Sequence, residues 1–445
     1  MQHYDLAIIG SGSGNTVARR ELADWRIAII EEGTFGGTCI NVGCIPTKMY
    51  VYAADVAETV ADAGRYGVDA SLDGVRWRDV RDRIYGRVHP VSESGREHRV
   101  DGANTTLYKA HAEFVSPHQL RLSTGEDITA DQIVIAAGSR PIVPPEVADA
   151  PHHTSSTIMT IDEVPDRLAI LGGGYVAAEF AHVFSSFGSQ VTIITHSHPL
   201  LPHLDREIAQ RFTDLAAKRW DVRLDVTVST VDGSRLTLSD GSTVDTDLLL
   251  VAAGRRPNSD RLNLEAAGVA LHDDRRIVVD EYQRTTTDGV WALGDVCSPH
   301  QLKHVSNHEA RVVSHNLAHP DDLVAADHRY VPAAVFTHPQ LATVGLTEEQ
   351  AREQGLDYVR GVKAFGDVAY GWAMEDTTGV AKVLADRTSG RLLGAHLMGP
   401  QSSSLIQPLV QAMSFGQAAH DVARGQYWIH PALAEVVENV LLKLR

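Results

Sequence analysis

Apolar runs of strand length, bounded by turn-forming residues, recur along most of the chain. Several are followed by longer segments in which apolar residues return at helical spacing. Alternation of this kind is typical of α/β proteins, whose parallel strands are buried on both faces. The runs that we interpret as buried strands are 4–10, 26–30, 132–138, 168–171, 191–194, 248–253 and 287–295.

The first two runs form a βαβ pattern. The first strand leads into Gly10-Ser11-Gly12-Ser13-Gly14, a helix is expected to about Leu22, and the second strand ends at Glu31. In a dinucleotide-binding unit Gly10 would make the tight turn and Gly12 would let the backbone approach a pyrophosphate. Glu31 would bind a ribose hydroxyl.

One position departs from this glycine pattern. Asn15 stands where a third glycine is usual, with Gly14 just before it. We therefore expect a looser contact between helix and strand, and we expect Glu32 to face solvent.

The same pattern returns later in the chain. The strand 168–171 leads into Gly172-Gly173-Gly174, a helix follows through Phe187, and the next strand is 191–194. Two such units indicate either that the protein binds two dinucleotides or that one of the units no longer binds one. After the second strand an acidic residue would favour NADH and arginines would favour NADPH. Thr195 and His196 stand there instead, so the pattern leaves the preference open.

Elsewhere the pattern predicts a helix over 75–100 with a break or kink at Pro90, and a proline-rich linker over 140–149. From about Tyr330 strands alternate with two helical runs, and an apolar helix is expected from Val436 to Leu444.

Two cysteines stand in a glycine-rich loop just after the first unit. Cys39 and Cys44 are followed by Pro46, which suits the first turn of a helix predicted over 49–63. A thiol at a helix N-terminus ionises more easily. A metal site would need about four ligands, and Cys297 is the only other cysteine. The loop therefore predicts a dithiol that can close to a disulfide, and no metal.

Composition narrows the possible partners. The chain of 445 residues carries a formal charge of −17, which disfavours nucleic acid and anionic membranes. No apolar run approaches the roughly 20 residues of a membrane span, and Met1-Gln2-His3 leads directly into a strand without a secretory leader. Three cysteines fit a reducing compartment, so we expect a cytoplasmic protein.

The loop also resembles a known signature. Gly36-Gly37-Thr38-Cys39, Asn41-Val42-Gly43-Cys44, Pro46 and Lys48 match the flavoprotein disulfide reductases. The resemblance implies two Rossmann-like domains, one for FAD and one for NAD(P)H, and a C-terminal α+β domain that dimerises. We expect an FAD domain with the dithiol over 1–148, an NAD(P) domain over 149–270, a return segment over 271–329 and an interface domain over 330–445.

The resemblance also implies residue roles. Cys39 would be the attacking, more exposed thiol, and Cys44 would lie against the flavin. Lys48 would pair with Glu179 beside the flavin ring, and Asp295 would bind the ribityl and phosphate region. The further positions expected at the cofactors are Gly10, Gly12, Gly14, Glu31, Thr38, Gly138, Gly172, Gly174, His196 and Gly254.

His430 is the acid–base candidate, because Pro431 follows it and Glu435 lies five residues on. A carboxylate bonded to one ring nitrogen would fix the tautomer. In the family this pair comes from the partner subunit and faces the dithiol, which implies a homodimer with a shared active site. We interpret His338 as structural and Cys297 as a thiol without a role.

Branches of the family differ at the C-terminus. The tail after Glu435 has no cysteine pair, which disfavours mercuric reductases and excludes large thioredoxin reductases. Residues 427–439 and Gly12-Ser13-Gly14-Asn15 most resemble the mycothione reductases, which implies reduction of a small disulfide, mycothiol disulfide, with NADPH or possibly NADH. The alternatives are a dihydrolipoamide dehydrogenase and, outside enzymes, a flavin-binding redox sensor.

Overall fold

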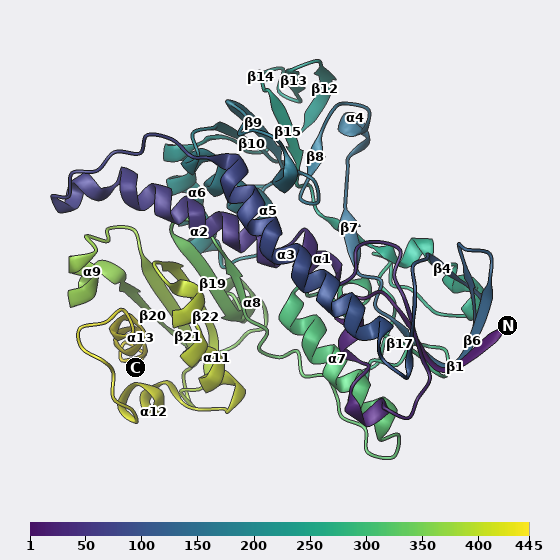
Figure 1. Cartoon of the computed structure of the whole chain (residues 1–445). Helices are drawn as coiled ribbons and strands as arrows, with labels where there is room; N and C mark the ends of the chain where they lie inside the picture. The colour runs from purple at the N-terminus through teal and green to yellow at the C-terminus, as the bar shows by residue number, and fades with distance from the viewer. Residues whose placement is uncertain (445) are drawn as a thin grey trace.

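The computed structural model describes residues 1–444. The chain forms three units, each built around its own sheet (Figure 1). The first unit contains the N-terminus, the second lies at the top of the view, and the third contains the C-terminus. The expected mixed α/β fold is confirmed.

The first sheet has seven strands in the order β3-β2-β1-β6-β5-β4, with β17 beside β6. Five of them, β3, β2, β1, β6 and β17, are parallel, and the β4–β5–β6 extension is antiparallel. Their bounds are β1 (Gln2–Ile9), β2 (Ile27–Ile30), β3 (Thr105–Tyr108), β4 (Ala112–Ser116), β5 (Gln119–Leu122), β6 (Asp127–Ile135) and β17 (Val290–Ala292).

The register brings the carboxyl ends of the parallel strands to one edge. Ile9 pairs with Ile30 on one side and with Ile135 on the other, and Ala292 pairs with Ile135. The residues that follow these strands therefore meet above the sheet, where open α/β sheets bind ligands. The helices of this unit are α1 (Gly37–Asn41), α2 (Cys44–Ala61), α3 (Trp77–Val100) and α7 (Lys303–Ala318).

The helix expected to run on to Leu22 is absent. Two short 3₁₀ helices, Gly14–Thr16 and Arg20–Leu22, stand there instead. Arg99 of α3 donates to the carbonyl oxygens of Asn15 at 2.8 Å and Ala18 at 3.1 Å. In an α-helix these carbonyl groups would accept backbone hydrogen bonds from residues four positions on. Here the side chain of Arg99 takes the place of those donors.

Two other expectations need correction. Of the break or kink expected at Pro90, the kink stays a prediction and the break is wrong, because α3 continues without interruption from Trp77 to Val100. Its residues Ile84 and Val88 are buried before the proline and Ser92 after it, so packing on both sides keeps the segment helical despite the lost hydrogen bond. The segment 140–149 is not a plain linker, because it contains part of β7 (Ser139–Pro141) and all of α4 (Pro145–Ala148).

The second unit repeats the parallel arrangement. Its sheet has the order β11-β10-β9-β15-β8, and a three-stranded antiparallel sheet, β12-β13-β14, stands beside it. The pair β7 and β16 connects this unit to the first. The bounds are β8 (His153–Thr154), β9 (Arg167–Leu171), β10 (Gln190–Ile194), β11 (Asp221–Arg223), β12 (Val228–Asp232), β13 (Arg235–Leu238), β14 (Thr243–Asp245), β15 (Leu248–Val251), β16 (Arg255–Pro257), α5 (Tyr175–Ser186) and α6 (Arg206–Arg219).

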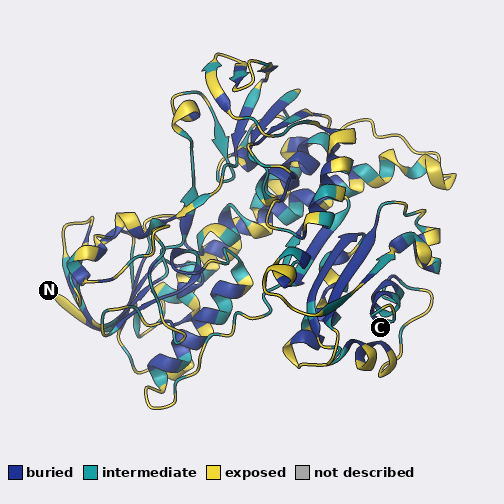
Figure 2. Cartoon of the chain, turned by 180° about the vertical axis from the view of Figure 1, so that it is seen from behind, coloured by how far each residue is buried: buried dark blue, intermediate teal, exposed yellow. Residues whose placement is uncertain are grey.

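The third unit is an antiparallel sheet of order β18-β19-β22-β21-β20 with helices packed around it. Its central strands are buried (Figure 2). The bounds are β18 (Ala333–Val335), β19 (Gln340–Gly345), β20 (Tyr358–Ala364), β21 (Val380–Asp386), β22 (Leu392–Gly399), α8 (Glu348–Glu353), α9 (Ala369–Ala373), α10 (Ser402–Leu405), α11 (Gln407–Ser414), α12 (Ala419–Arg424) and α13 (Glu435–Leu441).

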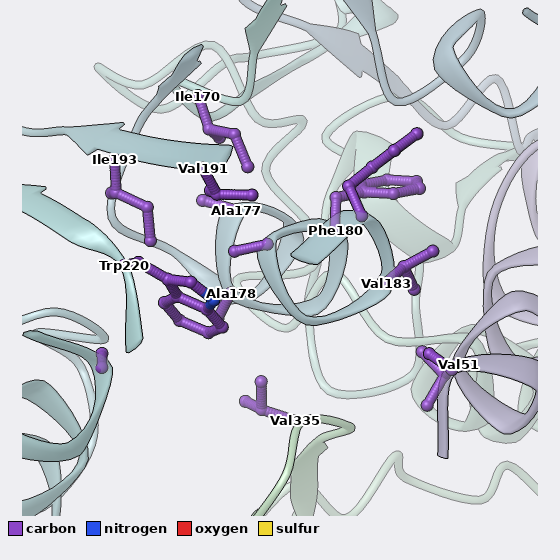
Figure 3. Packing of buried hydrophobic residues seen from close by; sticks show 14 of the residues in the cluster. Val51, Ile170, Ala177, Ala178, Phe180, Val183, Val191, Ile193, Trp220 and Val335 are labelled. Atoms are coloured by element: carbon purple, nitrogen blue, oxygen red, sulfur yellow. The ribbon is translucent and has the colours of Figure 1, made fainter. Parts of the chain in front are cut away.

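Helix α5 lies at the junction of the three units. Its residues Ala177, Phe180 and Val183 pack against strands of their own sheet, and also against Val51 of α2 and Val335 of β18 (Figure 3). A polar contact also joins α2 and α5, since Asp55 of α2 accepts a hydrogen bond from His182 of α5 at 2.8 Å. The core is therefore shared between units, which fixes α2 against the second unit.

A buried ion cluster joins the second and third units. The ammonium of Lys382 on β21 lies 2.9 Å from Oδ1 of Asp205 and 2.7 Å from Oε2 of Glu348. Lys382 is 1% exposed and Asp205 0%, so each charge depends on its partners. No helix within residues 1–444 is both long and apolar enough to cross a membrane.

Candidate active site

A cavity of about 460 Å³ lies above the carboxyl edge of the first sheet. This size falls within the roughly 300–1,000 Å³ of small-molecule sites. The expected positions that line it are Gly10, Gly12, Glu31, Thr38, Cys39, Cys44, Lys48, Gly138, Glu179 and Asp295.

Glycines let the loop after β1 approach its neighbours closely. Gly10 has φ +103, and a Cβ there would lie 2.3 Å from the carbonyl oxygen of Ala136. Gly14 is buried, and a Cβ there would lie 2.6 Å from Cβ of Ala136 and 3.0 Å from Ile8. The expected looseness at this point is wrong, because Gly14 itself makes the close contact with the sheet that Asn15 could not make.

Glu31 is held by the same loop. Its Oε2 accepts from the backbone N–H and the hydroxyl of Ser11, at 2.9 and 2.6 Å. Glu32 is exposed, as expected, and forms a two-pronged ion pair with Arg261 at 2.6 and 2.9 Å on the rim of the cavity. The two adjacent carboxylates therefore face different partners.

The dithiol spans two helices. Cys39 lies in the short α1, and Cys44 is the first residue of α2, at the positive end of the helix dipole. Both thiols are free. Cys39 is half-buried, and Cys44 is exposed to the first cavity, where the family resemblance places the flavin. Helix α1 packs closely on the glycine loop, since a Cβ at Gly37 would lie 2.7 Å from the Cα of Gly12.

The two sulfurs have opposite tendencies to ionise. The Cys39 thiol donates a hydrogen bond to the Cys44 sulfur, and this bond and the charge of Lys48 lower the pKa of Cys44 to about 7, although burial opposes the shift. The same bond and burial raise the pKa of Cys39 far above its ordinary value. Cys44 therefore carries the negative charge of the pair, and Cys39 keeps the proton.

Lys48 and Glu179 meet inside the cavity. Their Nζ and Oε2 atoms are 2.6 Å apart, and Glu179 is 3% exposed. The other carboxylate oxygen of Glu179 accepts from the backbone N–H of Phe336 at 3.0 Å, and the ammonium of Lys48 lies 4.7 Å from the centre of the Phe336 ring. All three units therefore contribute to the position of one lysine.

Asp295 follows β17 and lines the first cavity. Its Oδ2 accepts from the hydroxyl of Ser139 at 2.6 Å, and Ser139 Oγ in turn accepts from Nε of Arg255 at 2.8 Å. Gly138 has φ +67 just before this serine. These hydrogen bonds hold the Asp295 carboxylate in place at the wall of the cavity.

A second cavity, of about 680 Å³, lies above the carboxyl edge of the second sheet. The expected positions Gly172, Gly174, His196 and Gly254 line it, together with Pro202 and His203. The two cavities share part of their walls, formed by Ser155, Tyr175, Val176, Arg255 and Gln301. The two cavities therefore adjoin at this wall.

His430 and Glu435 form a pair outside both cavities. Nδ1 of His430 donates to Oε1 of Glu435 at 2.8 Å, and the other carboxylate oxygen accepts from the N–H of Ala432 at 3.2 Å. The hydrogen bond from His430 lowers the pKa of Glu435. The His430 side chain is 71% exposed, so within one chain it does not meet the dithiol.

Tyr175, Arg255 and Lys303 are among the residues of the cavity walls that sequence reasoning missed. Tyr175 and Arg255 lie on the shared wall, and Lys303 lines the first cavity from α7. Arg255 follows Gly254 directly and Tyr175 follows Gly174, so the motifs could have located both. Lys303 lies outside any motif. His338 stacks near His182, with ring centres 6.4 Å apart, and lines neither cavity. Cys297 is buried near Gln283.

Residues 4–312 match the pyridine nucleotide-disulphide oxidoreductase family, and residues 331–441 match its dimerisation domain. The chain is 55% identical to mycothione reductase of Mycobacterium tuberculosis over 100% of both chains. It is 34% identical to a dihydrolipoyl dehydrogenase of Halobacterium salinarum over 97% of this chain and 94% of that one.

A solved structure shares the whole fold. The HOCl-induced flavoprotein disulfide reductase RclA from Escherichia coli aligns with a TM-score of 0.88 and 31% identity, over 99% of this chain and 100% of that chain.

Proposed function

Because this chain belongs to the pyridine nucleotide-disulphide oxidoreductase family, we propose that it reduces mycothiol disulfide with electrons from NAD(P)H. It is a flavoprotein disulfide reductase that uses FAD and NAD(P)H. The observation that supports mycothiol disulfide as the substrate is the 55% identity to a mycothione reductase over the full length of both chains. The site of action that we propose is the cytoplasm, where thiols are kept reduced.

The residues of the first cavity fit FAD. A glycine loop at the sheet edge, the acidic Glu31 after the second strand and the anchored Asp295 are groups that suit a dinucleotide. FAD, when bound, supplies the passage of an electron pair from the nicotinamide to the dithiol. Lys48 would stabilise negative charge at the ring, and Glu179 would hold Lys48 in place.

The dithiol supplies the exchange chemistry. Cys39 would attack a sulfur of the substrate disulfide, and Cys44 would then displace the substrate thiol from Cys39. Because Cys39 holds the proton of the pair, its attack requires that this proton first pass to a base. Cys44, at the start of α2 and facing the cavity, would be the sulfur that lies against the flavin.

We also propose that each active site is shared between two copies of the chain. The match to the dimerisation domain supports a homodimer. His430 and Glu435 are exposed and lie outside the cavity that contains the dithiol of their own chain. In a second copy they could face that dithiol and move the proton of Cys39 to the leaving thiol.

For the nicotinamide we propose NADPH as the preferred form, with NADH accepted. His196 follows β10 at the position that contacts the adenosine ribose in Rossmann units, and His203 lines the same cavity. A histidine can bind a 2′-phosphate, but it lacks the permanent charge and forked geometry of arginine.

The substrate proposal is tested by measuring NADPH oxidation with mycothiol disulfide, glutathione disulfide and lipoamide. We expect kcat/KM for mycothiol disulfide to be at least about tenfold higher than for the others, a difference of about 1.4 kcal/mol. The Cys44→Ser protein, which lacks the dithiol, measures background oxidation of NADPH. Equal or faster turnover of lipoamide would instead indicate a dihydrolipoamide dehydrogenase.

Anaerobic titration with dithionite distinguishes a disulfide-reducing enzyme from a flavin-binding redox sensor that turns over no substrate. The FAD-loaded protein should take up about four electrons per flavin, two of them in the dithiol, and Cys44→Ser should take up about two. Uptake of two by both proteins would exclude a redox-active disulfide.

A further inference from the structure

The turn after β17 reaches the first cavity and packs tightly on α7. Its three residues, Leu293-Gly294-Asp295, all line that cavity. Gly294 has φ +74, and a Cβ there would lie 3.0 Å from Oγ of Ser306 on α7. Glycine therefore suits this position both for its backbone conformation and for the close approach of the helix.

The N–H of Gly294 has an acceptor outside the sheet. The N–H of Leu293 still donates to the carbonyl oxygen of Ile135 in β6, at 3.0 Å. Gly294 is buried one residue further on, where the strand pairing has ended. Its N–H donates to Oε2 of Glu309 on α7 at 2.6 Å. A buried N–H without a partner is costly, and a carboxylate is a stronger acceptor than a neutral oxygen.

The charge of this carboxylate is compensated in turn. Glu309 is 1% exposed and lines neither cavity. Its Oε1 lies 3.0 Å from Nε2 of His328, which belongs to the segment between α7 and β18. Both atoms are buried, and neither has a further partner among residues 1–444. Each of the two atoms therefore depends on the other.

Two more histidines surround His328, and they differ from it in their tendency to hold a proton. The ring centres of His300 and His308 lie 6.0 and 6.2 Å from that of His328. Burial lowers the pKa of both, and His328 adds to the effect. The contact with Glu309 raises the pKa of His328, although burial opposes the shift. His328 is therefore the ring of the three that supplies a cation to Glu309.

We propose that Glu309 is a positioning residue of the flavin site: through the N–H of Gly294 it sets the turn that presents the Asp295 carboxylate to the first cavity. This inference rests on the proposed function, which assigns FAD to that cavity. Asp295 is held on two sides, because its carboxylate accepts from Ser139 at 2.6 Å and its backbone directly follows the bonded Gly294. His328 acts one contact further away, by making the buried charge of Glu309 tolerable.

The test compares two substitutions of Glu309 in the holoenzyme. Glu309→Gln keeps an oxygen that can accept from the Gly294 N–H, and Glu309→Leu removes it. One measurement is the rate at which FAD leaves the diluted holoenzyme, followed by the fluorescence of free flavin. The other is hydrogen exchange in the segment 293–298, followed by mass spectrometry. In Glu309→Leu we expect both rates to rise at least about tenfold, and in Glu309→Gln to stay within about threefold of the unmodified protein.

Glu348→Leu is the matched control. The Glu348 carboxylate is also buried and paired, with Lys382 at 2.7 Å, but it belongs to the third unit and lines neither cavity. This substitution should lower the thermal unfolding midpoint and leave FAD release and exchange in 293–298 unchanged. It therefore separates positioning of the turn from a general loss of stability.

Three outcomes overturn the proposal. The first is an unchanged rate of FAD release in Glu309→Leu. The second is an equal acceleration in Glu348→Leu, and the third is a Glu309→Gln protein that behaves like Glu309→Leu. No substrate takes part in these measurements. A wrong substrate assignment would leave their result standing, and their failure would leave the substrate assignment standing.

Discussion

At the scale of single residues, the low pKa of Cys44 depends first on its neighbour. The hydrogen bond from the Cys39 thiol is the largest influence that lowers the Cys44 pKa to about 7. We therefore predict that Cys39→Ala raises the pKa of Cys44. The Cys44 thiolate should then be lost at a higher pH as the solution is acidified. The measurement is the ultraviolet thiolate absorbance of the reduced protein against pH, with Cys44→Ser as the blank. An unchanged midpoint would contradict the hydrogen-bond account.

His196 permits a second test at this scale. We predict that His196→Arg raises the preference for NADPH over NADH by about tenfold, because a guanidinium binds a 2′-phosphate with permanent charge and two donors. The measurement is the ratio of dissociation constants, from quenching of protein fluorescence by each nucleotide. His198→Arg is the control, because His198 pairs with Asp225 and does not line the cavity. Equal effects of the two substitutions would exclude a specific contact.

The sequence located residues where a motif fixes the local chemistry. The Cys39–Cys44 loop and the pairing of His430 with Glu435 both follow from short-range spacing. Lys303 could not be located in this way, because it meets the glycine loop across 290 residues of sequence and stands in a polar segment.

At the scale of elements, Gly14 decides how closely the glycine loop packs on the first sheet. We predict that Gly14→Ala destabilises the protein by about 1–3 kcal/mol and lowers its FAD content, because the new Cβ would meet Ala136 at 2.6 Å. The measurements are the thermal unfolding midpoint and the ratio of flavin to protein absorbance. Gly86→Ala is the matched control. It lies in α3 with no atom within 4 Å of the added Cβ, and it should be neutral or stabilising.

The elements themselves were largely predictable, because buried strands and amphipathic helices have strong periodic patterns. Two of the failures share one cause. The segment after Gly14 is a helix by sequence, yet Arg99 of a distant helix occupies its carbonyl groups. Pro90 is a breaker by sequence, yet α3 is packed on both sides of it. Local preference was overridden by tertiary contacts in both cases.

At the scale of the whole molecule, a shared active site makes a strict prediction. Cys39→Ser and His430→Ala should each be inactive as homodimers. Unfolding and refolding them together should restore about a quarter of the unmodified activity, because half of the dimers are mixed and one of their two sites is intact. A mixture that stays inactive, although mass spectrometry shows mixed dimers, would place the complete site within one chain.

The buried cluster of Lys382, Asp205 and Glu348 bears on how such proteins can be recombined. A chimera that takes its C-terminal domain from a relative with an apolar residue at position 382 would leave the Asp205 carboxylate enclosed without a counter-ion. Such a loss typically costs about 3–5 kcal/mol. The three positions therefore form a single unit of exchange, and domain grafts should transfer or replace them together.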